Sequence, residues 1–418
     1  MVDLTIERES VDSFYERARA WIVGHLPRSD RSVGFEVDDE AERVLIQEAR
    51  QVQRKIFDAE FAGIRYPPEY GGLGLTREHQ LAWARAATGF RLPSLFNVTH
   101  GIIGPTILEF GTEVQKRRFL PAMLRGEELW VQLLSEPSGG SDLAGLLTRA
   151  SRDGDAYVVN GCKTWSTRAQ FSDFAMALVR TDLDAPKHRG LSMIVFPMSS
   201  AGMTVRPIKL STGASHFCEE FLDDVVVPSA NLIGEENDGW RVASGLLYHE
   251  RAMVGGNSLN DHLLTSSAPE SVEDELVSLA KRLGTHSDPV VRQLIGEALV
   301  LRGLSEPTIQ RINSLMQVGQ LPPQASAILK LLGSTVQLRL SEIAMEIGGV
   351  RAAAADDDEI STYGLRWLGA RTTTIAGGSN EIQRNQISER ILGLPPEPSP
   401  DKGIPFRQVL ADRRTNQS

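Results

Sequence analysis

Four short apolar stretches decide the fold of this sequence: YVVNGCKTW (157–165), DFAMALVRT (173–181), LSMIVFPM (191–198) and MTVRPIKL (203–210). All four are rich in β-branched and aromatic residues, and Gly, Asp and Pro turns separate them, which is typical of β-strands. Because no helix-length periodic run interrupts them, they predict an antiparallel sheet or barrel rather than alternating strands and helices. No GxGxxG motif follows a strand, which argues against a Rossmann domain.

Helical periodicity surrounds this β region on both sides. It is found before the strands in AERVLIQEARQVQRKIFDAEFAG (41–63), and after them in runs at 289–317, 324–347 and 379–392. We therefore expect a mainly α-helical protein with a central β domain. The expected parts are an N-terminal helical domain, a middle β domain, a C-terminal helical domain and a Pro-rich extended tail, over residues 1–129, 130–236, 237–395 and 396–418.

The bulk composition is that of an ordinary globular protein, and it limits the possible partners. The chain has 418 residues, of which 41% are hydrophobic and 23% charged, and its formal net charge is −10. The acidic surplus argues against nucleic acid and against an anionic membrane surface as partners. No apolar run approaches the length of a membrane span, and the N-terminus lacks a signal-peptide pattern. With only two cysteines, Cys162 and Cys218, a disulfide framework is not expected, and we expect a cytoplasmic protein.

Two glycine-containing motifs have the composition of ligand-binding loops. LLSEPSGGSD (133–142) combines small residues, which let backbone N–H groups approach a ligand, with the hydroxyls of Ser135 and Ser141. GGSNEIQR (377–384) begins a helix with two glycines and a plausible N-cap, Ser379, and such a helix start can receive a phosphate or a carbonyl oxygen. The alternatives are a plain surface turn for the first motif and an ordinary helix start for the second.

A third motif, NGCKTWST (160–167), continues from an Asn-Gly turn into a strand. Trp165 and Thr167 alternate to the same face of that strand, where an aromatic ring and a hydroxyl could cover a planar ligand and bond its edge. The alternative is that Trp165 is an ordinary core tryptophan.

The stretch LLYHERAMVGG (246–256) carries a carboxylate on an apolar helix face. Ala243, Leu247 and Glu250 share one face at spacings of four and three residues. Arg251 points about a quarter-turn away and is therefore not an i,i+4 partner of Glu250. Because an unpaired buried carboxylate is costly, either another element supplies a partner for Glu250 or this carboxylate faces a cavity that takes a ligand.

Together and in this order, the motifs resemble those of the acyl-CoA dehydrogenase family. The segments that carry the resemblance, within about residues 10–395, are SEPSGGSDLAG (135–145), NGCKTW (160–165), PKHRGLSMIVFPM (186–198), FLDDVVVPSANLIGEENDGWRV (221–242) and GGSNEIQRNQISERILGLP (377–395). The resemblance implies an N-terminal helical domain, a middle β-barrel domain and a C-terminal four-helix bundle. It also implies FAD between barrel and bundle, an acyl-CoA substrate, an electron-transfer flavoprotein as electron acceptor, and a homodimer, homotetramer or heterotetramer.

The resemblance further implies roles for individual residues. Those implied to bind FAD within one chain are Gln132, Leu134, Ser135, Ser141, Trp165 and Thr167. Ser135 would lie near the pyrimidine edge of the flavin, Trp165 over one face of the ring system and Thr167 near N5. Those implied to contact the FAD of a neighbouring protomer are Gln293, Gly349 and the 379–383 turn with Ser379 and Glu381. Those implied to line the substrate are Ser141, Tyr248 and Arg251.

The position of the catalytic base departs from the most familiar family pattern. Many members place a glutamate just before the glycine of the C-terminal turn, but Gly377 occupies that position here. Isovaleryl-type and long-chain-type members place the base on the first bundle helix, directly before an arginine, which matches Glu250 and Arg251. The resemblance thus implies that Glu250 abstracts the substrate α-proton, with a pKa raised by desolvation. The backbone N–H of Gly377 would donate to the thioester oxygen. The alternative is that Glu250 is paired with a bundle arginine.

A second departure leaves three functions open. The family's Arg-x-Phe-Gly turn, which grips the partner's FAD pyrophosphate, is not evident in AKRLGTHSDPVVRQL (280–294), where Arg282 or Arg292 could replace it. The first function is FAD-dependent α,β-dehydrogenation of an acyl-CoA. The second is a non-catalytic or FAD-sharing subunit of a heteromer, and the third is a flavin oxidase or monooxygenase on the same fold. The intact SEPSGGSD motif, Trp165 and Glu250 favour the first.

Overall fold

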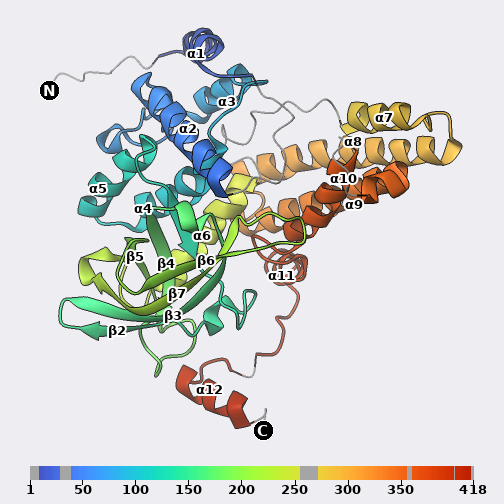
Figure 1. Cartoon of the computed structure of the whole chain (residues 1–418). Coiled ribbons are helices and arrows are strands. Elements are labelled where there is room, and N and C mark those ends of the chain that lie inside the picture. Colours follow the sequence, from blue (N-terminus) through green and yellow to red (C-terminus); the bar gives the residue numbers. More distant parts are fainter. Residues whose placement is uncertain (1–8, 29–38, 255–271, 355–359, 400, 416–418) are drawn as a thin grey trace.

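The protein consists of three parts that share one apolar core. The residues described by the computed structural model are 9–28, 39–254, 272–354, 360–399 and 401–415. N-terminal helices lie above a β domain, and long C-terminal helices project to one side of both (Figure 1). One apolar cluster contains Tyr66, Trp130 and Leu246, which come from the three parts. The predicted mainly α-helical fold with a central β domain is therefore confirmed.

The N-terminal helices are joined to the β domain through a helix cap. These helices are α1 (Val11–His25), α2 (Asp39–Asp58), α3 (Arg77–Ala86), α4 (Gly104–Phe110) and α5 (Glu113–Leu124). Helix α5 begins with a capping box, in which the Thr112 hydroxyl accepts from the Gln115 N–H and the Gln115 side chain accepts from the Thr112 N–H. The Gln115 amide also donates to the carbonyls of Ala230 and Leu232, at 2.8 Å each, so the cap fixes α5 against the end of the sheet.

The strands form one 8-stranded sheet, with the hydrogen-bonded order β6-β7-β3-β2-β4-β5-β8 and β1 paired with β4. They are β1 (Trp130–Leu133), β2 (Arg149–Asp153), β3 (Ala156–Thr167), β4 (Phe174–Arg180), β5 (Leu191–Pro197), β6 (Met203–Ile208), β7 (Phe217–Pro228) and β8 (Leu232–Ile233). The predicted antiparallel pairing holds for most neighbours, but β1 and β2 both run parallel to β4. Strand β1 has only four residues and follows the helical part directly, so its sequence carries little strand signal.

Strand β3 is interrupted by a bulge at the motif that contains the tryptophan. The register with β7 shifts between Thr164 and Ser166, and Trp165 has φ 65°, in the left-handed region. A bulge redirects a side chain, and here the ring of Trp165 is 56% exposed while Ser166 beside it is buried. The barrel end of β3 therefore presents an aromatic ring to the outside instead of adding it to the core.

The C-terminal part is built from long helices. They are α6 (Gly239–Val254), α7 (Val272–Leu283), α8 (Pro289–Gln317), α9 (Ser326–Ala353), α10 (Ser361–Ala370) and α11 (Asn380–Gln386), which a π-helical turn (Ile387–Ile391) follows. The runs predicted at 289–317 and 324–347 correspond to α8 and α9. An apolar cluster with members from α7, α8, α9 and α10 holds these helices together.

The tail expected to be extended over residues 396–418 contains a helix, α12 (Phe406–Thr415), so this expectation is wrong for that segment. Figure 1 shows α12 below the β domain. Phe406 is buried there, and its ring centroid lies 3.6 Å from the guanidinium carbon of Arg180. Lys187 pairs with Asp401 at 2.6 Å. The apolar anchor and the ion pair dock a segment that composition alone predicted to be extended.

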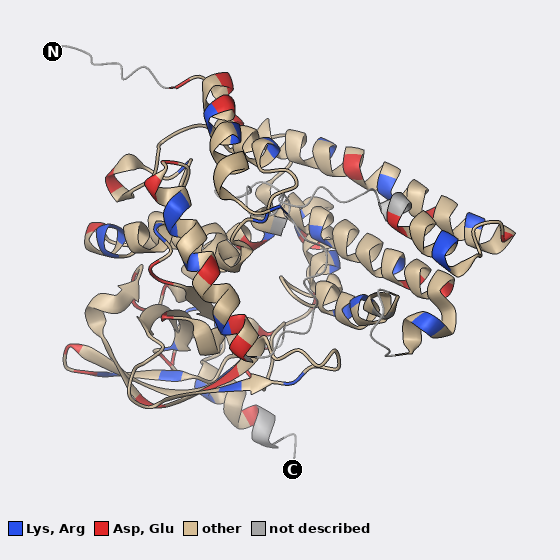
Figure 2. Cartoon of the chain, turned by 45° about the horizontal axis from the view of Figure 1, so that its top comes forward, with Lys and Arg blue, Asp and Glu red and all other residues tan. Residues whose placement is uncertain are grey.

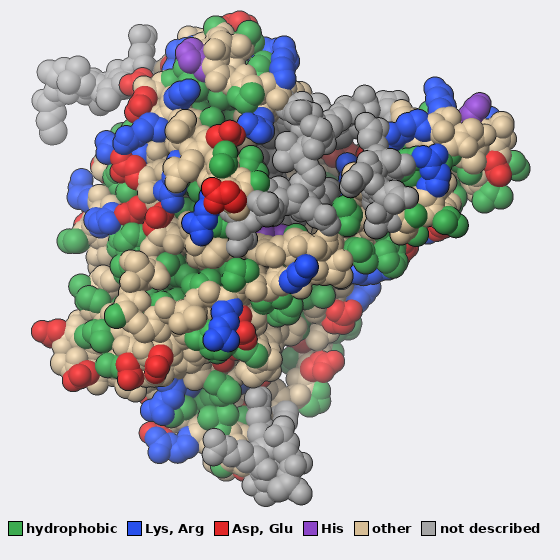
Figure 3. Space-filling model, in the orientation of Figure 1, with side chains coloured by type: hydrophobic (Ala, Val, Ile, Leu, Met, Phe, Trp, Pro, Cys, Tyr) green, Lys and Arg blue, Asp and Glu red, His purple; other side chains and the backbone are tan. Residues whose placement is uncertain are grey.

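The charged side chains are distributed along all parts of the molecule. Acidic and basic residues alternate along the helices in Figure 2, and they are interspersed over the face presented in Figure 3. Among the described residues, no helix combines the length and the apolar character that crossing a membrane would need.

Candidate active site

Glu250 lies on α6 at a junction of three chain segments. The Gln132 side-chain amide on β1 donates to the Glu250 carboxylate, with 3.4 Å between Nε2 and Oε2. A Cβ atom placed on Gly377 would lie 3.5 Å from Glu250 Oε1. Strand β1, the first bundle helix and the turn before α11 thus meet at this carboxylate. Residues 255–256, at the end of the LLYHERAMVGG stretch, lie outside the described residues.

The electrostatic surroundings of Glu250 favour its neutral form. Burial raises the pKa of its carboxyl group, while the hydrogen bond from Gln132 and the charges of Arg251 and Lys330 act in the opposite direction. Within the described ranges, no lysine or arginine lies within ion-pairing distance of this carboxylate. The alternative, in which Glu250 is paired with a bundle arginine, is therefore not found among the described residues.

The turn before α11 is held in a conformation that glycine favours. Gly377 and Gly378 have φ values of 68° and 87°, both in the left-handed region. The buried Gln383 side chain donates to the carbonyls of both glycines, at 3.0 and 3.3 Å, and the Ser379 hydroxyl caps α11 by accepting from the Ile382 N–H. The N-cap predicted at Ser379 is confirmed.

A buried lysine on α9 supports this turn, and it was not predicted from the sequence. Lys330 on α9 donates from Nζ to Asn380 Oδ1 at 3.0 Å, and the Ser334 hydroxyl donates to the same oxygen at 2.7 Å. Burial lowers the pKa of Lys330, while the charges of Glu381 and Glu250 raise it. The sequence did contain a signal for this buried lysine, because Lys330 is a charged residue inside the apolar stretch AILKLLG (327–333).

The side chains of Trp165 and Thr167 both lie outside the core of the β domain. The alternative of a core tryptophan is wrong, because the bulge exposes the Trp165 ring, which makes an edge contact with Phe217 at 6.2 Å between centroids. Thr167 lines a cavity of about 170 Å³ together with Trp130 and residues of the 94–98 segment other than Phe96. Ser141 is exposed in the glycine-rich loop, and Ser135 is half-buried at the start of that loop.

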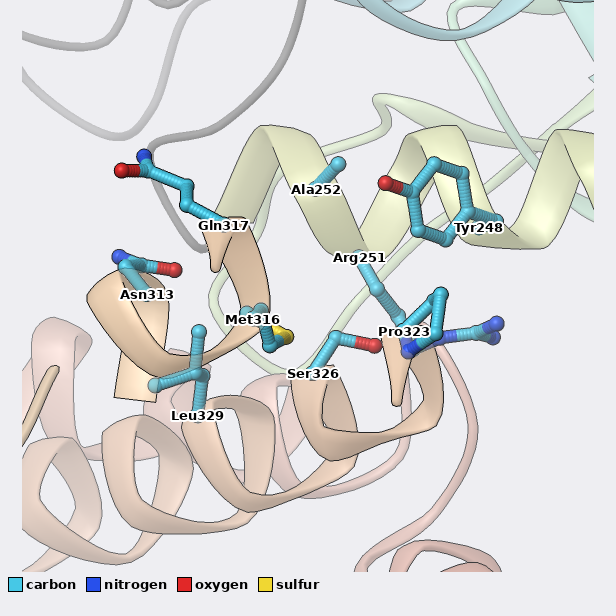
Figure 4. A pocket seen from close by; sticks show the side chains of 9 residues that line it. All are labelled: Tyr248, Arg251, Ala252, Asn313, Met316, Gln317, Pro323, Ser326 and Leu329. Carbon is cyan, nitrogen blue, oxygen red and sulfur yellow. The ribbon is translucent and has the colours of Figure 1, made fainter. Parts of the chain in front are cut away.

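Tyr248 and Arg251 line a second cavity, of about 240 Å³, between α6, α8 and α9 (Figure 4). Its remaining lining residues are Ala252, Asn313, Met316, Gln317, Pro323, Ser326 and Leu329. Burial lowers the pKa of Arg251, which the charge of Glu250 opposes. Glu250 is roughly 200° around the helix from both Tyr248 and Ala252, so this cavity and the carboxylate lie on different faces of α6.

Two of the residues implied to contact a neighbouring cofactor, Gln293 and Gly349, lie far from this cavity. Gln293 is exposed on α8, twenty residues before Asn313, and Gly349 is exposed on α9, twenty residues after Leu329. At 1.5 Å per helical residue, each is about 30 Å from the cavity that Asn313 and Leu329 line. Glu381 is exposed near the start of α11.

The geometry fits a planar aromatic ligand beside the barrel. The Trp165 ring offers an open face, and the Gln132 side-chain oxygen is buried without a hydrogen-bond partner. Such an oxygen is expected to be satisfied by a bound group. No cluster of three or more His, Cys, Asp or Glu side chains suited to a metal ion is found in the part of the chain that is described.

Comparison with known proteins assigns most of the chain to one class. The family models of the acyl-CoA dehydrogenase N-terminal, middle and C-terminal domains match residues 31–127, 132–225 and 237–392. Together with the helical–barrel–helical fold, these matches define an oxidoreductase of the flavoprotein class.

Individual relatives cover nearly the whole chain. It is 33% identical over 390 residues to the acyl-CoA dehydrogenase IpdE1 of Mycobacterium tuberculosis, covering 93% of this chain and 99% of the relative. It is similar to the solved structure of the Tcur3481-Tcur3483 steroid ACAD, with a TM-score of 0.74, 25% identity, and coverage of 93% and 99% of the two chains. It is also similar to the ChsE4-ChsE5 complex from Mycobacterium tuberculosis, with a TM-score of 0.70, 26% identity, and coverage of 95% and 100%. The chain therefore belongs to the acyl-CoA dehydrogenase family.

Proposed function

We propose that this chain catalyses the FAD-dependent α,β-dehydrogenation of an acyl-CoA thioester to the trans-2-enoyl-CoA, with Glu250 as the base. The observation that carries the proposal is the meeting of Glu250, Gln132 and Gly377 at one junction. A general base has to be within reach of the proton that it removes, on a site that excludes water. The position of Glu250 where barrel and bundle meet, and the partial burial of its carboxylate, support this role.

Each of the three residues has a separate task in this proposal. Glu250 takes the α-proton, and its raised pKa makes it a stronger base than an exposed glutamate. Gln132 orients the carboxylate through its amide hydrogen bond. The backbone N–H of Gly377 donates to the thioester oxygen, where negative charge develops as the proton leaves. When bound, FAD supplies the acceptor for the hydride that leaves the β-carbon.

The proposed cofactor contacts follow the exposed end of β3. Trp165 would cover one face of the flavin, and Thr167 would hydrogen-bond near N5. Leu134, Ser135 and Ser141 lie on the loop that follows β1, the strand that also carries Gln132. The open ring of Trp165 and the unpartnered Gln132 oxygen support this assignment.

We further propose that the active form is an oligomer in which two chains share each cofactor site. Gln293 and Gly349 are about 30 Å along α8 and α9 from the cavity beside α6, and we assign them to a cofactor that is bound mainly by another chain. A second copy, or a related chain, would bring these residues to it. Ser379 and Glu381, and Arg282 or Arg292 at the pyrophosphate, complete the proposed shared contacts.

The proposed substrate is a CoA thioester with a bulky, cyclic acyl group. Tyr248 and Arg251 line the cavity of about 240 Å³ on another face of α6 than Glu250, so there the partly buried guanidinium would suit an anionic part of the substrate away from the reacting carbon. The similarity to a steroid ACAD supports a polycyclic acyl group. The proposed electron acceptor is an electron-transfer flavoprotein. Cys162 and Cys218 form no disulfide, which supports the proposed cytoplasmic location.

Anaerobic flavin reduction tests the proposal directly. The purified protein is expected to be yellow and to be bleached by a polycyclic acyl-CoA faster than by short, branched or long straight-chain acyl-CoA thioesters. A yellow protein that none of these thioesters bleaches would contradict the activity. Rapid reoxidation of the reduced flavin by oxygen would instead favour an oxidase or monooxygenase.

A second candidate function is that of an FAD-sharing subunit in a heteromer. Two similar structures contain pairs of differently named chains, and the usual Arg-x-Phe-Gly turn is not evident in this sequence. In that case the protein purified alone is expected to be colourless and to acquire FAD only when it is co-expressed with a related chain. Size-exclusion chromatography with light scattering then separates a homo-oligomer from a heterotetramer.

A further inference from the structure

A cluster of buried charged residues lies beneath the glycine-rich loop and β3, and the proposed reaction does not use it. Lys163 and Glu220 are 0% exposed, and Glu136 and Ser166 are also buried. Burying charges is expensive unless they are paired, so this cluster requires an explanation. Two carboxylates and one ammonium group leave one carboxylate without a compensating charge.

Lys163 and Glu136 form the compensated pair. Lys163 Nζ donates to Glu136 Oε1 and to the Leu134 carbonyl, at 3.0 Å each. Burial alone would raise the pKa of Glu136, but the Lys163 charge and the backbone N–H groups of Leu147 and Thr148 hold this pKa below its ordinary value. The pair therefore fixes the start of the glycine-rich loop.

Glu220 is the uncompensated carboxylate. It lies opposite Lys163 in the register of β7 with β3. Its Oε2 accepts a hydrogen bond from the Ser166 hydroxyl at 2.9 Å, and its Oε1 has no hydrogen-bond partner. Burial raises the pKa of Glu220 to about 7, although the Ser166 hydrogen bond and the Lys163 charge oppose the increase.

The groups around Glu220 are few and well defined. Strand β3 contributes Cys162 and Lys163, and β7 itself contributes Glu219. On the other side, the register partner of Glu220 on β6 is the apolar Val205. Burial, together with Glu219 and the buried carboxylates, raises the pKa of Cys162 to about 11, so this thiol remains neutral. Glu220 is therefore the member of this group that changes charge near pH 7.

We propose that Glu220 is a positioning residue of the flavin site, and that loss of its proton weakens FAD binding. Its hydrogen bond holds Ser166, which stands between Trp165 and Thr167, the two residues assigned to the flavin. Its negative charge lies buried on the side of β3 behind these contacts, where it opposes an anionic cofactor through a poorly screened interior. The inference rests on the proposed function, because it needs FAD at this end of β3.

The affinity of the full-length protein for added FAD tests the proposal, measured by quenching of flavin fluorescence between about pH 6 and pH 8.5. If FAD disfavours ionised Glu220, bound FAD raises the pKa of this residue. The dissociation constant then increases as the pH rises through 7, by about tenfold for each pKa unit of that change. In Glu220→Gln, it is expected to be independent of pH and close to the low-pH value of the wild type. Glu219→Gln is the matched control: it keeps Glu220 and therefore the increase of the dissociation constant with pH, and its midpoint moves only to lower pH, because the Glu219 charge helps to raise the pKa of Glu220.

A second variant keeps the test decisive if Glu220→Gln fails to fold. Ser166→Ala removes the hydrogen bond that favours ionised Glu220, so the midpoint of the affinity profile is expected to move to higher pH. A flat wild-type profile, or one that Glu220→Gln leaves unchanged, overturns the inference while leaving the proposed function intact. A protein that does not bind FAD at any pH, alone or with a related chain, overturns the proposed function as well.

Discussion

At the scale of single residues, Glu250 combines an apolar setting with a neutral hydrogen-bond donor, Gln132. Glu250→Gln keeps the shape of the side chain and removes its ability to accept a proton. We expect this variant to bind FAD normally and to reduce it with acyl-CoA about 10²–10⁴ times more slowly, the usual contribution of a positioned base. Anaerobic stopped-flow absorbance of the flavin measures the rate.

The matched control is a neighbouring carboxylate outside the junction. Glu109 on α4 pairs with His249 at 3.0 Å, and its side chain is 51% exposed. Glu109→Gln is expected to reduce flavin at close to the wild-type rate, because exposed pairs contribute little. Wild-type rates in both variants would show that the base lies elsewhere.

The pH dependence of the reaction follows from the same burial. Since burial raises the pKa of Glu250 above the ordinary 4.5, the ionised fraction declines at a higher pH than for an exposed glutamate. The base acts only when it is ionised, so kcat/KM is expected to fall as the pH decreases through this raised pKa. The Glu220→Gln variant lacks the second titrating carboxylate. Its kcat/KM, measured by steady-state kinetics, should therefore fall over the same acidic pH range as that of the wild type. An acidic limb centred at 4.5 or below would contradict a desolvated base.

At the scale of elements, the placement of Gly377 depends on how α11 is fastened to α9. Asn380→Ala removes the oxygen that accepts from Lys330 and Ser334 and leaves both donors buried. An unsatisfied buried donor costs about 1–3 kcal/mol, so we expect a comparable loss in the free energy of unfolding. The loosened turn should also lower kcat, because Gly377 no longer meets the thioester oxygen in a fixed position. Urea unfolding and steady-state kinetics measure the two effects.

Thr335→Ala is the control for this element. Its hydroxyl donates to the Leu331 carbonyl within α9, on the exposed side, one residue after Ser334. Its removal is expected to change stability by less than about 0.5 kcal/mol and to leave kcat unaffected. If the two variants behave alike, α9 does not support the turn in the way that the hydrogen bonds indicate.

The elements also show how far the sequence could predict the site. Periodicity identified the strands and the long helices, because side-chain alternation and helical spacing are local properties. The exposure of Trp165 could not be predicted in this way, because it depends on a bulge between Thr164 and Ser166 that is set by pairing with β7. Likewise, the burial of Lys330 depends on Asn380, fifty residues away. Helix α12 was missed because the Pro-rich stretch before it dominated the composition.

At the scale of the whole molecule, the C-terminal segment returns to the loop that carries Ser141. Lys187 bridges Asp401 and Asp142, at 2.6 and 3.0 Å, and Asp142 is the residue after Ser141. The Arg180 guanidinium, which lies against Phe406, donates to the carbonyls of Ala144 and Leu146, in the segment that follows. The family model ends at residue 392, so this contact lies beyond the part matched by the family.

Removing residues 401–418 is therefore expected to affect the loop as well as the terminus. The truncation exposes the surface that Phe406 covers, and burying a phenylalanine is worth about 1.5–3 kcal/mol, so the melting temperature should fall. Because Lys187 and Arg180 lose partners that fix them beside the loop, FAD affinity should also fall several-fold, as measured by fluorescence titration. Arg407→Gln is the control: it breaks a pair with Asp184 in which the side chains are 67% and 73% exposed, and neither quantity should change. Unchanged FAD affinity in the truncated chain, despite a lower melting temperature, would mean that α12 contributes only to stability.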